Sequence, residues 1–463
     1  MSKVLLISSN TLTEPYPVYP LGMAVVASAL SSKGHNVMQY DFLAAAQSLE
    51  ALRDAVVDFD PDYVGISIRN IDTVDSFTAT DAWTMDANKA VTKVIKEVKE
   101  VPVVLGGPAF SIMPKVILDY VGADYGVVGD GGVGFGDLIE QLKEGQSPPP
   151  ILEGTPSSIN GDLKLQPLWS KALVDHYHKN RGVIGLQTKR GCPYACTYCT
   201  YPTVEGTAYR PREPESVVED IQQLKTDYHI DTIFFTDSVF NDTDELYLGV
   251  VEEILRKKVS LTWSAFFRPD RSVAKHIELL KRSGLSAVEI GTDASSDITL
   301  AGLNKPFCFD DVLRFSETCL GENIPCIHYI MFGGPEETEL TVKQGLENIS
   351  LLKNSVVIAF SGIRIFPRTS LYKRALSEGI IGNDDSLLRP TFYFSPHLDR
   401  DQMNSNIENA FRHQRQKIFP PSSGQATLKA LYSLGYEGFQ WHRLLSLDRQ
   451  GLRKRKRTGH RLS

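Results

Sequence analysis

The chain has 463 residues, with 49 Lys and Arg against 56 Asp and Glu, and 42 % of its residues are hydrophobic. At about 100–200 residues per domain this length predicts several domains, and the apolar fraction excludes a wholly disordered chain. No apolar run approaches the ~18–20 residues that span a bilayer, and the N-terminal segment does not resemble a signal peptide. Six cysteines in so long a chain do not indicate a disulfide framework. We therefore expect a cytoplasmic protein.

The charged residues are unevenly distributed. Segment 443–461 holds eight Lys and Arg and one acid, a local charge of +7, which leaves −14 on the rest of a chain whose total is −7. A body this acidic repels phosphodiester backbones, so we do not expect nucleic acid as a substrate. The basic run 453–457 is typical of a solvated chain end, and contact with RNA or an anionic lipid surface is the alternative.

The first 150 residues alternate short apolar runs with helical patterns. We predict strands at residues 4–8, 36–40, 63–68, 102–105 and 125–128. We predict helices around residues 22–33, 82–100, 114–120 and 135–144. This alternation favours an α/β domain, a Rossmann-like doubly wound parallel sheet with helices on both faces.

Small and polar residues follow several of these predicted strands. Open parallel sheets bind ligands in the crevice beyond the carboxyl ends of their strands. Glycine at that edge lets a bulky ligand approach the backbone closely. The candidate ligand-binding residues there are Ser67, Arg69, Gly106, Gly107, Gly129 and Asp130.

A proline-rich connector at 146–151 places the end of the first domain near residue 150, followed by a linker at 151–181. A second βα series occupies 182–380, with strands predicted at 185–188, 232–236, 261–266, 287–290, 327–332 and 356–365. The helices between them are predicted at 214–228, 244–257, 274–283, 309–321 and 339–353. Six repeats of this kind fit a partial TIM-like (β/α)6 barrel.

Residues 381–463 predict a small, mainly helical C-terminal region, with helical patterns at 401–418 and 425–434. We expect this region to cover the mouth of the barrel. Within the fifth barrel strand, His328 and Tyr329 point to opposite faces. One of the two therefore faces the lumen and is a candidate for substrate contact, with a structural role as the alternative for both.

Three cysteines, Cys192, Cys196 and Cys199, lie within eight residues immediately after the first predicted barrel strand. That is the end of the barrel at which such folds place their chemistry. Three thiolates on one loop can hold an iron–sulfur cluster or zinc. A structural zinc site normally has four ligands, and no Cys or His lies at finger spacing nearby. Three ligands on a four-iron cluster leave one iron open to a small molecule.

The spacing Cys-x3-Cys-x2-Cys, with Tyr198 before the last cysteine, resembles the radical S-adenosylmethionine (SAM) superfamily. Further segments resemble motifs of that family in the same order: 234–241 (FFTDSVFN), 264–270 (SAFFRPD), 289–296 (EIGTDASS), 333–338 (GGPEET) and 366–372 (FPRTSLY). The resemblance implies a [4Fe–4S] cluster on the three cysteines and SAM on the open iron. It also implies SAM contacts from Asp237, Arg268, Asp293, Ser295 and Ser296.

The first domain in turn resembles the cobalamin-binding domain of cobalamin-dependent radical SAM enzymes. The segments that carry this resemblance are 20–24 (PLGMA), 33–37 (KGHNV), 106–108 (GGP) and 128–131 (VGDG). The resemblance implies that the candidate residues at the edge of the first sheet contact cobalamin. No Asp-x-His-x-x-Gly motif occurs, so bound cobalamin would be base-off without a histidine ligand. The pattern Gly129-x-Gly-x-x-Gly also fits a dinucleotide fingerprint, but it lies in the last βα unit and not the first.

Together these resemblances imply an enzyme, a cobalamin-dependent radical SAM methyltransferase. It would act on an unactivated carbon of a small-molecule or lipid-type substrate through a 5′-deoxyadenosyl radical, with an external electron donor of the flavodoxin or ferredoxin type. One alternative is an oxidative cyclase or ring-rearranging enzyme that transfers no methyl group. The non-enzymatic alternative is a metal- or corrinoid-binding scaffold.

Overall fold

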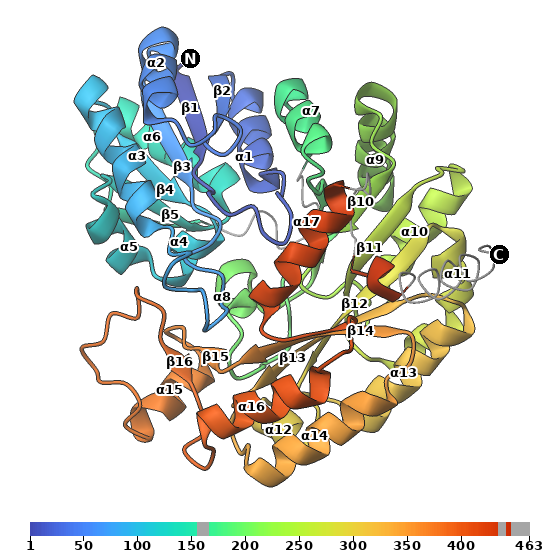
Figure 1. Ribbon diagram of the computed structural model, residues 1–463. Helices are drawn as coiled ribbons and strands as arrows, with labels where there is room; N and C mark the ends of the chain where they lie inside the picture. Colours follow the sequence, from blue (N-terminus) through green and yellow to red (C-terminus); the bar gives the residue numbers. More distant parts are fainter. Residues whose placement is uncertain (155–165, 434–440, 446–463) are drawn as a thin grey trace, which may run out of the picture.

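The computed structural model describes residues 1–154, 166–433 and 441–445. Two parallel β-sheets dominate the molecule, each covered by helices, and the chain passes from the first sheet to the second (Figure 1). The basic run 453–457 lies outside the described residues. Among those described, no helix is both long and apolar enough to cross a membrane.

The first sheet has six parallel strands in the order β2-β1-β3-β4-β5-β6. Its strands are β1 (Lys3–Ser8), β2 (Asn36–Asp41), β3 (Tyr63–Ser67), β4 (Val103–Gly106), β5 (Tyr125–Gly129) and β6 (Ile151–Gly154). The helices of this part are α1 (Leu21–Ser32), α2 (Leu49–Phe59), α3 (Met85–Val98), α4 (Pro108–Ile112), α5 (Pro114–Val121) and α6 (Gly131–Lys143). The doubly wound parallel sheet expected from the sequence is thereby confirmed.

Two elements of the first sheet differ from the expectation. Strand β6 lies beyond the expected boundary at residue 150, and it extends the sheet by pairing in parallel with β5. Its four residues include Glu153 and Gly154, so they show no apolar run that could identify a strand. Helix α2 was not predicted, although Ser48 caps it by accepting a hydrogen bond from the Ala51 amide at 3.1 Å.

The second sheet has seven parallel strands in the order β17-β14-β13-β12-β11-β10-β7. These strands are β7 (Gly185–Leu186), β10 (Thr232–Phe235), β11 (Thr262–Phe267), β12 (Leu285–Asp293), β13 (Cys326–Phe332), β14 (Ser355–Ser361) and β17 (Lys417–Ile418). The helices around it are α7 (Lys171–Lys179), α8 (Tyr201–Glu205), α9 (Pro214–Tyr228), α10 (Leu246–Arg256), α11 (Ile277–Arg282), α12 (Asp297–Gly302), α13 (Phe309–Gly321) and α14 (Glu339–Leu351). The six predicted strands follow one another across this open sheet, which confirms a partial barrel.

Several short elements complete the second domain and the C-terminal region. They are β8 (Lys189–Arg190), β9 (Arg210–Pro211), β15 (Ile363–Arg364), α15 (Ser370–Ser377), β16 (Phe392–Tyr393), α16 (Arg400–Phe411) and α17 (Gln425–Ser433). The strand predicted at 356–365 is interrupted at Gly362, whose φ of 77° breaks the extended backbone. The helix predicted at 401–418 ends at Phe411, and residues 417–418 instead add β17 to the edge of the sheet.

The C-terminal region closes one part of the inner, concave face of the second sheet. Helix α17 and the short segment that follows it contribute Leu428, Leu431 and Trp441 to a cluster with Ile327 and Ile358 of the inner face. Figure 1 shows α17 crossing this sheet. This packing involves Ile327, near the start of β13, and therefore lies toward the amino-terminal end of the sheet, away from the barrel mouth. That the region covers the mouth stays a prediction.

The two sheets also share hydrophobic cores. One continuous cluster joins Leu6 and Ala24 of the first domain to Tyr177 and Val217 of the second through Trp169. A buried ion pair between Asp72 and Arg364, 2.9 Å apart, crosses the same boundary. The domains are therefore fixed against each other by apolar burial as well as by charge.

The first sheet has a sharp steric constraint at Gly126 of β5. A Cβ atom there would lie 2.0 Å from the Phe110 ring, so Gly126→Ala forces the ring of α4 out of place. We expect a loss of about 1–3 kcal/mol in the free energy of unfolding, measured by chemical denaturation. Gly22→Ala in α1 is the control, because its Cβ would meet no atom within 4 Å. Equal stability of the two variants would contradict this packing.

Candidate functional site

The cysteine loop, residues 191–200, connects β8 to α8 at the carboxyl end of the second sheet. Gly191 begins the loop with φ of 90°, and a Cβ there would lie 1.9 Å from the Ala208 carbonyl oxygen. Only glycine therefore allows the chain to turn into the loop at this point. The Cys192 amide donates to the Gly206 carbonyl at 3.1 Å, which closes the loop against the end of α8.

The three cysteines of the loop lie close enough to influence one another. Burial together with the neighbouring thiols raises the pKa of Cys199 to about 12 and also raises the pKa of Cys192. A bound cation would reverse this effect, because metal ligation requires thiolates and releases their protons. The described residues contain no group of three His, Cys, Asp or Glu side chains placed to hold a single metal ion.

A lysine from outside the loop approaches these thiols. The ammonium group of Lys305, after α12, lies 3.3 Å from the Cys196 sulfur and also forms an ion pair with Asp293 at the end of β12. The same group lies 5.6 Å from the centre of the Tyr198 ring. Lys305 is 109 residues from Cys196, and nothing in the sequence connects the two. The structure thus adds a cation beside the cysteines of the loop, which sequence reasoning missed.

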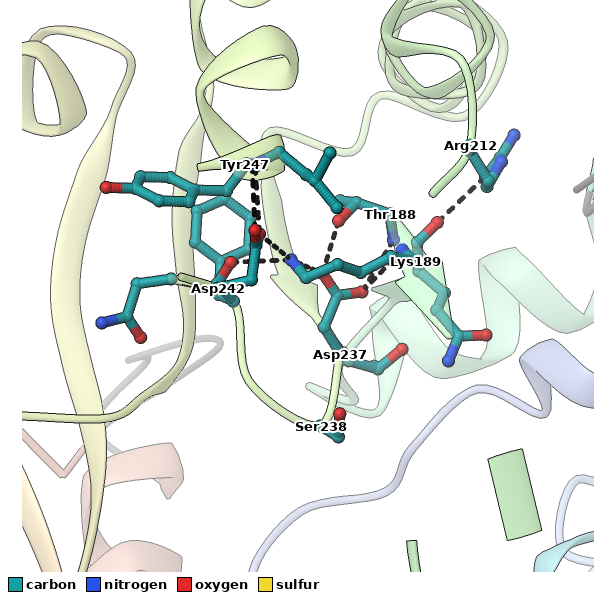
Figure 2. A network of polar contacts seen from close by, with 12 residues as sticks. Thr188, Lys189, Arg212, Asp237, Ser238, Asp242 and Tyr247 are labelled. Atoms are coloured by element: carbon teal, nitrogen blue, oxygen red, sulfur yellow. Dashed lines mark hydrogen bonds and ion pairs between the residues drawn. The ribbon is translucent and has the colours of Figure 1, made fainter. Parts of the chain in front are cut away.

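A buried charge network anchors the start of the cysteine loop (Figure 2). The Lys189 ammonium lies 3.2 Å from both Asp237 and Asp242 and donates to the Phe240 carbonyl at 2.7 Å. The Asp237 carboxylate also accepts hydrogen bonds from the backbone amide and the hydroxyl of Thr188. Asp242 in turn accepts from two backbone amides at the start of α10. Strand β8 is therefore fixed to the β10–α10 connection.

The residues expected to contact SAM lie in different surroundings, and only some of them reach the cysteine loop. Asp293 and Arg268 reach the cysteine loop, Asp293 through Lys305 and Arg268 by stacking on the Tyr194 ring at 4.4 Å. Asp237 is fully buried in the Lys189 network.

The two serines of this set belong to helix ends. Ser296 caps α12 by accepting from the Thr299 amide at 3.2 Å. Ser295 is buried and lies close to α14. A Cβ on Gly345 of that helix would lie 2.3 Å from the Ser295 hydroxyl oxygen. The SAM contacts of all five residues stay predictions.

The edge of the first sheet carries glycines at two neighbouring strand ends. A Cβ on Gly106 or Gly129 would make only ordinary van der Waals contacts, none closer than 3.7 Å, so neither position is tightly packed. Gly107 has φ of 95°, and a Cβ there would lie 2.6 Å from the Ile68 carbonyl oxygen. The chain can therefore make this turn only with glycine. Ser67, half-buried, ends strand β3 at the same edge.

Asp130 connects this edge to the cysteine loop. Its carboxylate lies 2.6 Å from the Arg190 guanidinium and 3.8 Å from that of Arg210. Arg190 immediately precedes the cysteine loop, and Arg210 lies on the strand paired with it. The expected cobalamin contact of Asp130 stays a prediction, and the structure adds a second role for this residue, which is to hold the two domains together.

Arg69 follows strand β3 at the edge of the first sheet. Its side chain is exposed to solvent, yet desolvation lowers its pKa. Tyr201 of α8 combines the same two properties, with an exposed fraction of 37 % and a pKa raised by burial. A side chain that is both accessible and desolvated lies in an enclosed space, so we infer such a space between the edge of the first sheet and the cysteine loop. No hydrogen bond or ion pair of Arg69 is found within the described ranges.

The inner face of the second sheet contributes a group of aromatic and acidic side chains. Glu289 of β12 accepts a hydrogen bond from the Tyr329 hydroxyl of β13 at 2.7 Å. Phe266 of β11 lies edge-on to Tyr329, with 6.3 Å between ring centres. His328 points to the opposite face and hydrogen-bonds Thr292 at 2.8 Å. Tyr329 is therefore the residue of this pair that faces the lumen, and His328 has the structural role.

Comparison with known proteins gives independent evidence on both domains. Residues 8–139 match the sequence profile of the B12 binding domain, and residues 186–348 match that of the radical SAM superfamily. The tryptophan 2-C-methyltransferase of Streptomyces laurentii is 26 % identical, over 77 % of this chain and 72 % of that protein. An uncharacterized methyltransferase of Pyrococcus horikoshii is 24 % identical, over 78 % and 79 % of the two chains.

Solved structures show the same arrangement of domains. The radical S-adenosylmethionine methyltransferase TsrM of Kitasatospora setae, with cobalamin and a [4Fe–4S] cluster bound, superposes with a TM-score of 0.84 at 23 % identity. That match covers 97 % of this chain and all of the other. The cobalamin-dependent radical enzyme OxsB gives a TM-score of 0.70 at 14 % identity, over 93 % of this chain and 71 % of the other. At these identities the likeness establishes the shared fold.

The Lys189 network gives a direct test of how the cysteine loop is held. Lys189→Met leaves two buried carboxylates without their cation, so we expect a loss of about 3–5 kcal/mol in the free energy of unfolding, together with a lower iron content after reconstitution. The control is Lys281→Met, which removes an exposed pair with Glu322 and changes stability by less than about 1 kcal/mol. Wild-type stability and iron content in Lys189→Met would contradict the anchoring role.

Proposed function

The chain belongs to the cobalamin-dependent radical SAM family, and we propose that within this family it is a methyltransferase acting on an unactivated carbon of a small-molecule or lipid-type substrate. The observation that carries the proposal is the ion pair between Asp130 and Arg190. This pair brings the glycine-bordered edge of the first sheet to the start of the cysteine loop. A methyl donor on one side and a radical generator on the other would then share one enclosed space.

The residues of the chain fit the three cofactors of this family. Cys192, Cys196 and Cys199 supply the thiolate donors that an iron–sulfur cluster requires. No close contact would meet a Cβ on Gly106 or Gly129, and glycine at this edge would let a broad ring approach the backbone. When bound, the cluster and SAM supply a 5′-deoxyadenosyl radical, and cobalamin supplies the methyl group.

The protein's own contribution is placement, charge and exclusion of water. Lys189 and its two carboxylate partners fix the entry into the cysteine loop. Lys305 places a positive charge beside Cys196. Arg69 supplies a second cation from the opposite side of the space. We further propose that an external electron donor of the flavodoxin or ferredoxin type reduces the cluster.

The names of the relatives favour methyl transfer over the alternative reactions. The Streptomyces relative is named for methylation of tryptophan at C-2, and another, from Rhodopseudomonas palustris, is named a hopanoid C-2 methylase. One relative, from Rubrivivax gelatinosus, is named a cyclase, which keeps ring closure as the second candidate. The diversity of these names leaves the substrate of the present chain to experiment.

A cysteine substitution tests the cluster assignment. We expect Cys196→Ala to lower the iron content from about four per chain to near zero and to abolish 5′-deoxyadenosine formation from SAM under anaerobic, reducing conditions. Cys308→Ala is the matched control, because Cys308 caps α13 through Asp311 and lies outside the cysteine loop. Retention of a full cluster by Cys196→Ala would contradict the assignment.

Isotope transfer tests the reaction class. The reconstituted protein is incubated with SAM carrying a deuterated methyl group, a reductant and a small-molecule fraction of a cell extract, and the products are analysed by mass spectrometry. We expect a product that carries the deuterated methyl group with the wild-type chain and not with Cys196→Ala. Formation of 5′-deoxyadenosine without labelled product would favour cyclisation or rearrangement, and the absence of both would favour a scaffold.

A further inference from the structure

Glu289 is a buried carboxyl group without a positively charged partner. It lies in the middle of β12 with an exposed fraction of 1 %. Its only hydrogen bond within the described part of the chain is the one that Oε2 accepts from the Tyr329 hydroxyl at 2.7 Å. Oxygen Oε1 has no such partner there. Because nothing cationic offsets its burial, the pKa of Glu289 is raised to about 7.

Several other buried carboxylates among the described residues are paired with a cation. Asp237 and Asp242 share Lys189, Asp72 pairs with Arg364, and Asp220 lies 2.6 Å from the Arg212 guanidinium. Glu337 is buried and its pKa is likewise raised to about 7, but it accepts hydrogen bonds from backbone amides, including that of Gly334 at 3.0 Å. Asp41 and Asp75 also have no cationic partner within the described ranges, but each accepts from a backbone amide. An uncompensated buried charge costs several kcal/mol. Among the described residues Glu289 therefore differs in having neither a cation nor a backbone amide as its partner.

Aromatic side chains surround Glu289 on the inner face. Tyr329 and Phe266 lie on the neighbouring strands, and Phe234 lies edge-on to Phe266 with 5.0 Å between ring centres. Tyr16, from the segment between β1 and α1, lies within electrostatic reach of Glu289 and also of Arg69. Ring faces attract cations, so these walls suit the same ligand charge as the carboxylate does.

The position of Glu289 along its strand relates it to the cysteine loop. Glu289 precedes Asp293 by four residues, a span of about 13 Å along β12. Asp293 lies at the end that reaches Lys305 and Cys196. Beyond Glu289 in the other direction, α17 and Trp441 fill the inner face. A ligand held at Glu289 therefore extends toward the cysteine loop and not away from it.

We propose that Glu289 is the anchor of the substrate and binds a protonated amine, with Phe266, Tyr329 and Tyr16 enclosing the carbon skeleton next to it. The substrate class is then an organic ammonium compound with an aromatic or similarly flat apolar group. This proposal names the substrate class of the proposed methyltransferase. It rests on that proposed function, because only an enzyme would turn the bound amine into a product. The ammonium ion supplies the countercharge that the chain itself does not provide.

Binding of two probes of opposite charge tests the proposal. The probes are 2-phenylethylamine and 3-phenylpropionate, which share a ring and differ in the sign of their charge. Binding to the cofactor-loaded chain is measured by anaerobic calorimetry at neutral to mildly alkaline pH. We expect the wild-type chain to bind the amine at least about tenfold more tightly than the acid, a difference of about 1.4 kcal/mol. Equal binding, a preference for the acid, or no saturable binding of the amine at about 10 mM, above ordinary substrate ranges, would overturn the proposal.

Two matched variants test whether the Glu289 carboxylate is the group that binds the amine. Glu289→Gln keeps the shape of the side chain and removes its charge, so we expect at least about a tenfold loss of amine affinity and no change in binding of the acid. Glu337→Gln is the control, because Glu337 is the compensated buried carboxyl, and it should bind the amine as the wild type does. Unchanged amine affinity in Glu289→Gln would overturn the assignment.

The cofactor content of each variant is read in parallel from iron analysis and the cobalamin spectrum. If Glu289→Gln does not load its cofactors, the comparison of the two probes on the wild-type chain decides the question. Amine binding that depends on Glu289, in a protein that transfers no labelled methyl group, would retain the amine site and reject the methyltransferase function. Methyl transfer without a preference for the amine would retain the methyltransferase function and reject the amine site.

Discussion

The arrangement of the whole molecule depends on how the carboxyl edge of the first sheet is held against the cysteine loop of the second. The Asp130 carboxylate contacts two arginines from the strands on either side of that loop, and the pair with Arg190 is short, at 2.6 Å. The buried pair between Asp72 and Arg364 and the shared apolar core reinforce the same orientation. Two edges that could otherwise move independently are thereby held next to each other, as the proposed shared space requires.

Compensation of buried charge distinguishes the scaffold from the site. Where a carboxylate supports the structure, the chain provides a cation or backbone amides, as Lys189 does for Asp237 and Asp242 and the Gly334 amide does for Glu337. Where the chain faces the enclosed space, groups remain without that compensation. Arg69 is desolvated there without a carboxylate partner among the described residues, and Glu289 has only the Tyr329 hydroxyl. Ligands of opposite charge can supply what the fold leaves out.

Much of the fold could be predicted because its elements have strong local patterns. The alternation of apolar runs and helical periods predicted both parallel sheets, and the spacing of Cys192, Cys196 and Cys199 predicted the site. Strand β6 and strand β17 were missed because they are short and their pairing is decided by the neighbouring strand. Lys305 was missed because its contact with Cys196 joins residues 109 positions apart. The burial of Asp237 and Glu289 likewise depends on how strands pack, which local sequence does not encode.

If one enclosed space serves both the cluster and cobalamin, the two centres are close enough to interact magnetically, and electron paramagnetic resonance measures that interaction directly. The protein is loaded with the cluster and with cob(II)alamin, and the cobalamin spectrum is recorded before and after reduction of the cluster. The account predicts broader cobalamin lines and faster spin relaxation once the cluster is paramagnetic, because the two centres lie side by side. A cobalamin spectrum that does not respond to the state of the cluster would contradict it.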